Sequence, residues 1–209
     1  MAATTVEPDE TIYILDLANP DASKAIPLYT PTTGLAVKAD KVVYADALDF
    51  NSTGEFLLYD ALNRLTLAEG DSIEYWDASR LDIASGIITP FLPARPDGIS
   101  SGNPSFAQTS DLNLVFDLFD EAAGVFTVVS ADLFTGTYQV IDSNGNAPGY
   151  PRCSTMDDKI VYERAVGEVR NVKQAPLAKD KITPAGPPAG CHGGSLKTLF
   201  SSCCLYRLG

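Results

Sequence analysis

Short apolar stretches alternate with turn-forming residues along most of the chain. The stretches are rich in Val, Ile, Tyr, Phe and Thr, and clusters of Gly, Pro, Asn, Asp or Ser bound them, which is typical of β-strands. The predicted strands are 12–17, 41–50, 55–62, 112–119, 125–133, 137–141 and 159–163. No long helical apolar period competes with them, although 60–70 could form a short helix. The pattern therefore predicts an all-β protein.

The predicted strands fall into a repeated unit. A strand, a polar turn and a second apolar strand ending in an aromatic residue and an acid occur at 48–60, 104–117 and 151–163. A strand, a small turn and another strand follow at 80–91, 130–141 and, less clearly, 174–183, with an earlier copy at 13–29. A repeat of about fifty residues with four short strands is typical of β-propeller blades. Stacked four-stranded antiparallel blades would bury both faces of each sheet.

These repeats resemble the TolB-like, WD-like β-propeller repeat over residues 11–183. The blade core of that family reads P-S-F-S-P-D-G-K-x-I-A-F, followed by a strand and a D-x-x-T-G turn. The matching segments, best first, are NPSFAQTSDLNLVFD (103–117) with DLFTG (132–136), LDFNSTGEFLLYD (48–60) with DIASG (82–86), and YPRCSTMDDKIVYE (150–163). All three copies lack the Pro of the family's turn, and only Gly54 keeps its Gly.

The predicted organisation is a partial or open propeller ring of about three and a half blades. The predicted blade segments are 11–33, 41–92, 103–142 and 149–183. We expect residues 1–10 to be disordered and the Gly, Pro and Cys-rich residues 184–209 to be a linker or a reading-frame artefact. An open arc would present apolar blade faces to missing blades or to a second chain. In the alternative, a closed four-bladed ring, 196–208 would complete the first blade.

Charge and length exclude several classes of protein. The 209 residues include 15 Lys or Arg and 27 Asp or Glu, so the net charge is −12 and a basic nucleic-acid surface is absent. No apolar run is long enough to span a bilayer, so we expect no membrane insertion. No signal peptide is visible at the N-terminus, which leaves a cytoplasmic protein or an interior piece of an exported chain.

One hairpin segment has the spacing of a calcium-binding loop. Asp49, Asn51 and Thr53 alternate, Gly54 is sixth and Asp60 is twelfth, as in an EF-hand. The flanking segments read as strands rather than helices, so an ordinary turn between two strands is the favoured interpretation. The same holds for the Asn and Gly-rich segment 142–149, where the twelfth position is not an acid. We therefore predict no cofactor and no metal.

The sequence shows no catalytic constellation. The single His192 lies beside Cys191 in the Gly-rich tail, about eleven residues before Cys203 and Cys204, and this spacing does not favour zinc. A general base cannot be held in such a tail, and no nucleophile elbow, P-loop or dinucleotide motif is present. The prediction is that the chain is not an enzyme.

Two further groups of residues are candidates for binding. Tyr75 and Trp76 could anchor a partner, although packing between blades is the favoured alternative. Asp60, Asp117 and Glu163 recur at one position of the repeat, which we expect to lie near a rim. There the acids could bind cations or a basic partner, but a solvated edge that prevents aggregation is favoured.

The predicted function is a non-catalytic scaffold for protein–protein interaction. A stacked-sheet support holds many short loops whose residues can vary without disturbing the core. The resemblance to TolB-like propellers implies a periplasmic or secreted protein that binds partners of the bacterial envelope. Similar repeats also form the gating propeller of prolyl-oligopeptidase-like serine hydrolases. The alternative is therefore the propeller portion of such a hydrolase, with the catalytic domain absent from this chain.

Overall fold

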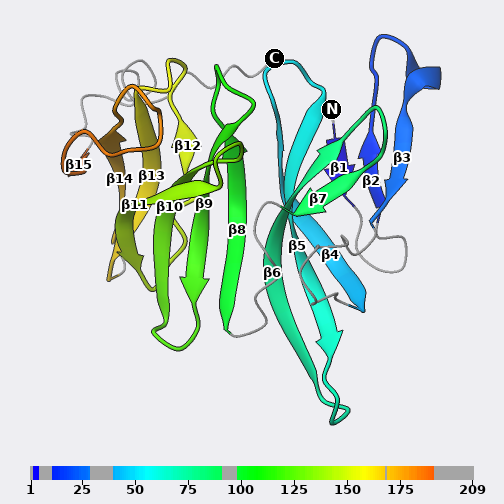
Figure 1. Cartoon of the computed structure of the whole chain (residues 1–209), viewed down its shortest axis with the longest axis horizontal. Coiled ribbons are helices and arrows are strands. Elements are labelled where there is room, and N and C mark those ends of the chain that lie inside the picture. Colours follow the sequence, from blue (N-terminus) through cyan, green and yellow to red (C-terminus); the bar gives the residue numbers. More distant parts are fainter. Residues whose placement is uncertain (1, 5–10, 29–39, 91–97, 168, 191–209) are drawn as a thin grey trace. The chain divides into compact units, whose positions relative to one another are not determined.

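The computed structural model describes residues 2–4, 11–28, 40–90, 98–167 and 169–190 (Figure 1). Strands predominate in these ranges, and their only helix is the single 3-10 turn Pro20–Ala22. The all-β prediction is therefore confirmed. The possible helix at 60–70 is wrong: strand β5 runs over Phe56–Thr66, because it pairs along its length with a strand on either side.

The strands form four antiparallel sheets, which we number first to fourth in chain order. The first sheet contains β1 (Ala2–Thr4), β2 (Thr11–Ile14) and β3 (Lys24–Pro27). The second contains β4 (Lys41–Phe50), β5, β6 (Ser72–Asp82) and β7 (Ile88–Pro90). The third contains β8 (Ile99–Phe106), β9 (Asn113–Asp120), β10 (Val125–Asp132) and β11 (Thr137–Gly145). The fourth contains β12 (Arg152–Cys153), β13 (Lys159–Val166), β14 (Val169–Pro176) and β15 (Ala189–Gly190).

Every sheet is a meander, in which the spatial order of the strands follows the chain. The repeat is also visible in the backbone. Ala47, Asn103 and Tyr150 have φ angles of 47°, 53° and 47°, a left-handed conformation that is uncommon outside Gly. Each lies three residues before Phe50, Phe106 or Cys153, which stand at equivalent positions of the repeat segments 48–60, 104–117 and 151–163. The same tight corner thus begins the second, third and fourth repeats.

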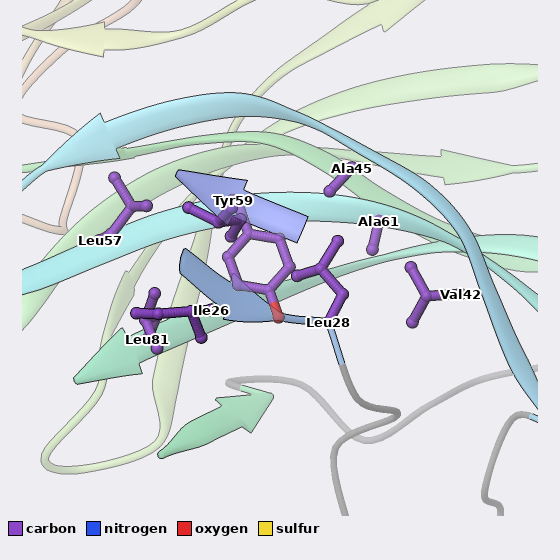
Figure 2. Close-up of a cluster of buried hydrophobic side chains, with 9 residues drawn as sticks. Ile26, Leu28, Val42, Ala45, Leu57, Tyr59, Ala61 and Leu81 are labelled. Atoms are coloured by element: carbon purple, nitrogen blue, oxygen red, sulfur yellow. The ribbon is translucent and has the colours of Figure 1, made fainter. Parts of the chain in front are cut away.

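The chain divides into two compact units, 1–103 and 104–209, and the boundary falls within β8. The core of the first unit lies between the first and second sheets (Figure 2). Alternate residues of β5 supply Leu57, Tyr59 and Ala61, because side chains two apart share one face of a strand. The buried residues of this core are Ile12, Ile26, Leu28, Val42, Ala45, Leu57, Tyr59, Ala61 and Leu81.

The core of the second unit lies between the third and fourth sheets. The third sheet contributes Val115, Val128 and Ile141 to this core. β13, β14 and the residue directly after β14 contribute Ile160, Tyr162, Ala175 and Leu177. In both units, therefore, two neighbouring sheets bury apolar faces against each other, as expected for stacked blades.

Two predicted boundaries change. Ala2–Thr4, within the segment expected to be disordered, pairs with β2 as strand β1. Within 184–190, expected to begin a linker, Ala189–Gly190 pair with β14 as strand β15, and Pro184 forms an isolated bridge with Leu177. Residues 191–209, including the proposed closing strand 196–208, lie outside the described residues.

Candidate functional site

The recurring acids hold the start of the following repeat. Within the first unit, Asp60 is buried and its Oδ2 accepts a hydrogen bond of 2.6 Å from the backbone N–H of Asn103. Within the second unit, buried Asp117 accepts bonds of 2.9 Å from the N–H groups of both Gly149 and Tyr150. Consecutive N–H groups at such a corner form an anion-binding concavity, which the carboxylate fills. The predicted solvated edge is therefore wrong for Asp60 and Asp117.

Glu163 occupies the same repeat position in the fourth sheet but behaves differently. Its carboxylate forms an ion pair of 2.9 Å with Arg170 of the neighbouring strand, and both side chains are substantially exposed. Exposed ion pairs of this kind contribute little stability. The solvated-edge interpretation agrees with the position of Glu163 alone.

A third carboxylate joins the turns of the third and fourth sheets. Asp157, whose side chain is 0% exposed, accepts bonds from the N–H groups of Gln108 (2.7 Å) and Thr109 (2.8 Å). It also accepts the Thr109 hydroxyl at 2.6 Å and lies 3.3 Å from the Lys181 ammonium, which itself contacts the Thr109 hydroxyl. Asp157 has a φ of 53° and stands where the family has Gly, so one residue supplies both the turn and the anchor.

The structure does not gather the calcium candidates into one site. Asn51 and Thr53 lie in the turn between β4 and β5, where Asn51 donates to the Thr53 hydroxyl and accepts from the backbone N–H of Phe56. Asp60 lies farther along β5, opposite Asp46, and Asp49 lies opposite Leu58. Asn51 and Thr53 thus serve the hairpin, and Asp60 serves the corner.

The second calcium candidate, 142–149, is also used internally. Asp142 accepts bonds of 2.6 Å from both the Tyr162 hydroxyl and Arg164, and the Asn144 amide donates to the carbonyl of Ala147. Across the described ranges, no group of three or more His, Cys, Asp or Glu side chains could hold a metal ion. Cys191, His192, Cys203 and Cys204 lie outside those ranges.

Buried tyrosines predict a loss of stability at alkaline pH. Burial raises the pKa of Tyr75 from 10.0 to about 12, and burial followed by the bond to Asp142 raises the pKa of Tyr162. Because the fold favours the protonated phenols, their contribution is complete below pH 10 and is lost as pH rises through the folded values. We expect the free energy of unfolding to fall between pH 10 and 12, and the loss to be smaller in Tyr75→Phe.

Absorbance titration of tyrosinate, recorded together with circular dichroism, measures this effect. Some of the nine tyrosines should ionise only as the protein unfolds. If all nine titrate together near their ordinary pKa while the fold persists, the prediction is wrong.

The predicted aromatic anchor is largely internal. Tyr75 is buried in the first unit, and Trp76 is half-buried with its ring edge-to-face against Tyr44 at 5.1 Å between centroids. Edge-to-face packing of this kind stabilises a fold. The placement of Tyr75 does not fit an interaction surface, and the alternative of packing fits both residues better.

A different apolar surface is exposed at the end of the third sheet. Phe134 in the turn between β10 and β11 is 82% exposed, and Tyr138 and Val140 of β11 are 56% and 55% exposed. Tyr138 and Val140 lie opposite Ala131 and Val129 of β10, so the two share one face. We name Phe134, Tyr138 and Val140 the β11 surface. The sequence prediction included this strand and turn, but nothing in the pattern showed that their side chains are uncovered.

Comparison with known proteins identifies the fold. No family model and no curated protein matches this chain. TolB from Acinetobacter baumannii has a similar structure, with a TM-score of 0.58, 12% sequence identity and coverage of 85% of this chain and 39% of that chain. The sheets have the fold of β-propeller blades like those of TolB.

Peptidase structures contain similar sheets. Dipeptidyl peptidase 4 from Porphyromonas gingivalis matches with a TM-score of 0.51 and 11% identity, covering 93% of this chain and 32% of that chain. This chain thus spans between about a third and two fifths of the length of these two proteins. At such identities the likeness shows the fold alone. No helix in the described part of the chain has the length and apolarity to cross a membrane.

Proposed function

We propose that this chain is a non-catalytic scaffold on which another protein docks. The observation that carries the proposal is the β11 surface, in which Tyr138 and Val140 of β11 and Phe134 of the turn before it are each more than half exposed. Tyr138 and Val140 share one face of β11, and neighbouring exposed aromatic and branched side chains are typical of interaction sites rather than of ordinary solvated strands.

The support beneath this surface is fixed by buried polar contacts. Asp117 and Asp157 tie the third sheet to the backbone and turns of the fourth, and Asp142 bonds to Tyr162 and Arg164 of β13. A binding surface on such a support loses little conformational entropy when a partner arrives. This arrangement supports a docking role.

The resemblance to TolB-like propellers supports the compartment and the kind of partner. On this basis the chain acts in the periplasm or outside the cell and binds a protein of the bacterial envelope. The alternative is the gating propeller of a prolyl-oligopeptidase-like serine hydrolase, which is favoured by the likeness to dipeptidyl peptidase 4. In that case the partner of the β-sheets is a hydrolase domain rather than a separate protein.

Site-directed photo-crosslinking in the source cells tests the proposal. A photo-reactive amino acid is placed at position 134 and, as a matched control, at position 169, because Val169 is also an exposed apolar residue of the second unit. We expect a protein adduct from position 134 and none from position 169. The protein identified in the adduct, once purified, should bind this chain. If position 134 yields no specific adduct, the proposal is wrong. An adduct within a serine hydrolase domain supports the alternative.

A further inference from the structure

The last strand of the third sheet differs from the other last strands. β3 has four residues and ends in Pro27, β7 has three and ends in Pro90, and β15 has two. β11 has nine residues and lies at the edge of its sheet (Figure 1). Short strands and Pro are the ordinary means by which proteins prevent a sheet edge from pairing with another chain. β11 carries neither.

The long strands at the other sheet edges are covered. β8 is mostly buried, and the described side chains of β4 are mostly buried or half-buried. By contrast, four consecutive residues of β11, 137–140, are exposed, so both faces of the strand are accessible there. In β14, residues 169–172 are also exposed and extend beyond the two residues that pair with β15, but that segment carries Arg170. Residues 137–140 of β11 therefore form a long, exposed sheet edge without a charged residue.

The chemistry of this edge favours pairing with an extended segment. Residues 134–141 read FTGTYQVI, without charge or Pro and with aromatic and β-branched side chains. An unpaired strand edge offers backbone N–H and C=O groups, and alternate side chains give specificity to an added strand. Irregularities in the pairing with β10 begin beyond Val140, so the regular edge is limited to 137–140.

The charge around this edge indicates the kind of segment it accepts. Residues 98–151, which contain the whole third sheet, include six Asp or Glu and no Lys, Arg or His. The negative field of this sheet attracts cationic segments. A second copy is the less favoured occupant, because it would bring the same acidic sheet and a net charge of −12.

We infer that the β11 edge is a strand-addition site for an extended partner segment in which apolar residues alternate with Lys or Arg. The added strand pairs its backbone with 137–140 and packs its apolar side chains on Tyr138 and Val140. The inference rests on the proposed docking function and specifies its site and its partner chemistry.

Binding of synthetic peptides to the full chain tests this inference. One peptide alternates Val and Tyr with Lys, a second replaces every Lys with Glu, and a third is the Lys peptide with N-methylated backbone amides. We expect the Lys peptide to bind at least about tenfold more tightly than the other two. Added salt should weaken the binding of the Lys peptide. The bound Lys peptide should slow amide hydrogen exchange at 137–140. Equal binding of the three peptides, or protection elsewhere, would overturn the inference.

Paired variants locate the site. The double variant Tyr138→Ser, Val140→Ser should lower the affinity for the Lys peptide by about tenfold or more. Val166→Ser with Val169→Ser is the matched control, because these residues are also exposed and lie opposite each other, and it should bind as the unaltered chain does. Equal losses in both pairs contradict the site. The N-methylated peptide keeps the test valid if a variant fails to fold.

Two outcomes separate this inference from the proposed function. If no peptide binds at 137–140 but position 134 still crosslinks to a partner, strand addition is wrong and the scaffold role stands. If sedimentation shows a dimer that Tyr138→Ser with Val140→Ser abolishes, a second copy occupies the edge and the cationic partner is wrong.

Discussion

Asp157→Ala is expected to lower the free energy of unfolding by about 4 kcal/mol, since it removes a buried anion and leaves its partners without an acceptor. The lost contacts are those to the backbone N–H groups of Gln108 and Thr109, the Thr109 hydroxyl and Lys181. Ala must also adopt the φ of 53° that Asp tolerates better. Urea unfolding followed by circular dichroism measures the change.

Two variants separate the causes of this loss. Asp157→Gly accepts the positive φ without strain and should be less destabilised than Asp157→Ala by about 1 kcal/mol. The adjacent Asp158 is the matched control, because it is exposed and its carboxylate bonds only locally, to the Ser154 hydroxyl. Asp158→Ala should cost less than about 1 kcal/mol. Equal losses at positions 157 and 158 would contradict the role of Asp157.

Asp117→Asn should lower the free energy of unfolding by about 2 kcal/mol, although it changes the side chain by one atom. The Asp117 carboxylate accepts from Gly149 and Tyr150 with both oxygens, so an amide must direct a donor at one of these N–H groups. The corner cannot easily adjust, because a Cβ on Gly149 would lie 2.7 Å from Val128. The same urea unfolding measures the effect.

Glu163→Gln is the control that the repeat itself provides. Glu163 occupies the equivalent position, but its ion pair with Arg170 is substantially exposed. The expected loss is below about 0.5 kcal/mol. If Asp117→Asn and Glu163→Gln prove equally mild, the carboxylate at this position does not join the sheets.

Much of this architecture follows from local sequence signals. Alternating apolar residues and turn clusters predicted strands that the structure contains, and the spacing of the repeats indicated four-stranded sheets. The recurring acids were recognised as a repeated feature, but their environment was not. Whether Asp117 or Glu163 is buried depends on which backbone lies against it, and no local pattern along one strand contains that information.

The candidate surface shows the same limit. Tyr75 and Trp76 stood out because Trp is rare in this chain, yet Tyr75 is buried and Trp76 packs against Tyr44. Phe134 and Tyr138 belong to the best-matching repeat and read as ordinary strand and turn residues. Tyr138 lies in β11, the last strand of its sheet, and Phe134 lies in the turn before it. Their exposure is a property of the assembled sheet rather than of the segment.

Amide hydrogen exchange at Gly149 and Tyr150 tests most directly the claim that buried carboxylates join successive sheets. Both N–H groups precede β12 and bond to Asp117, so they should exchange about as slowly as amides in the interior of the third sheet. In Asp117→Asn they should become fast while β9 and β10 stay protected. Gly124 lies in the turn between β9 and β10. If the N–H groups of Gly149 and Tyr150 exchange as fast as that of Gly124 in the unaltered chain, the account is wrong.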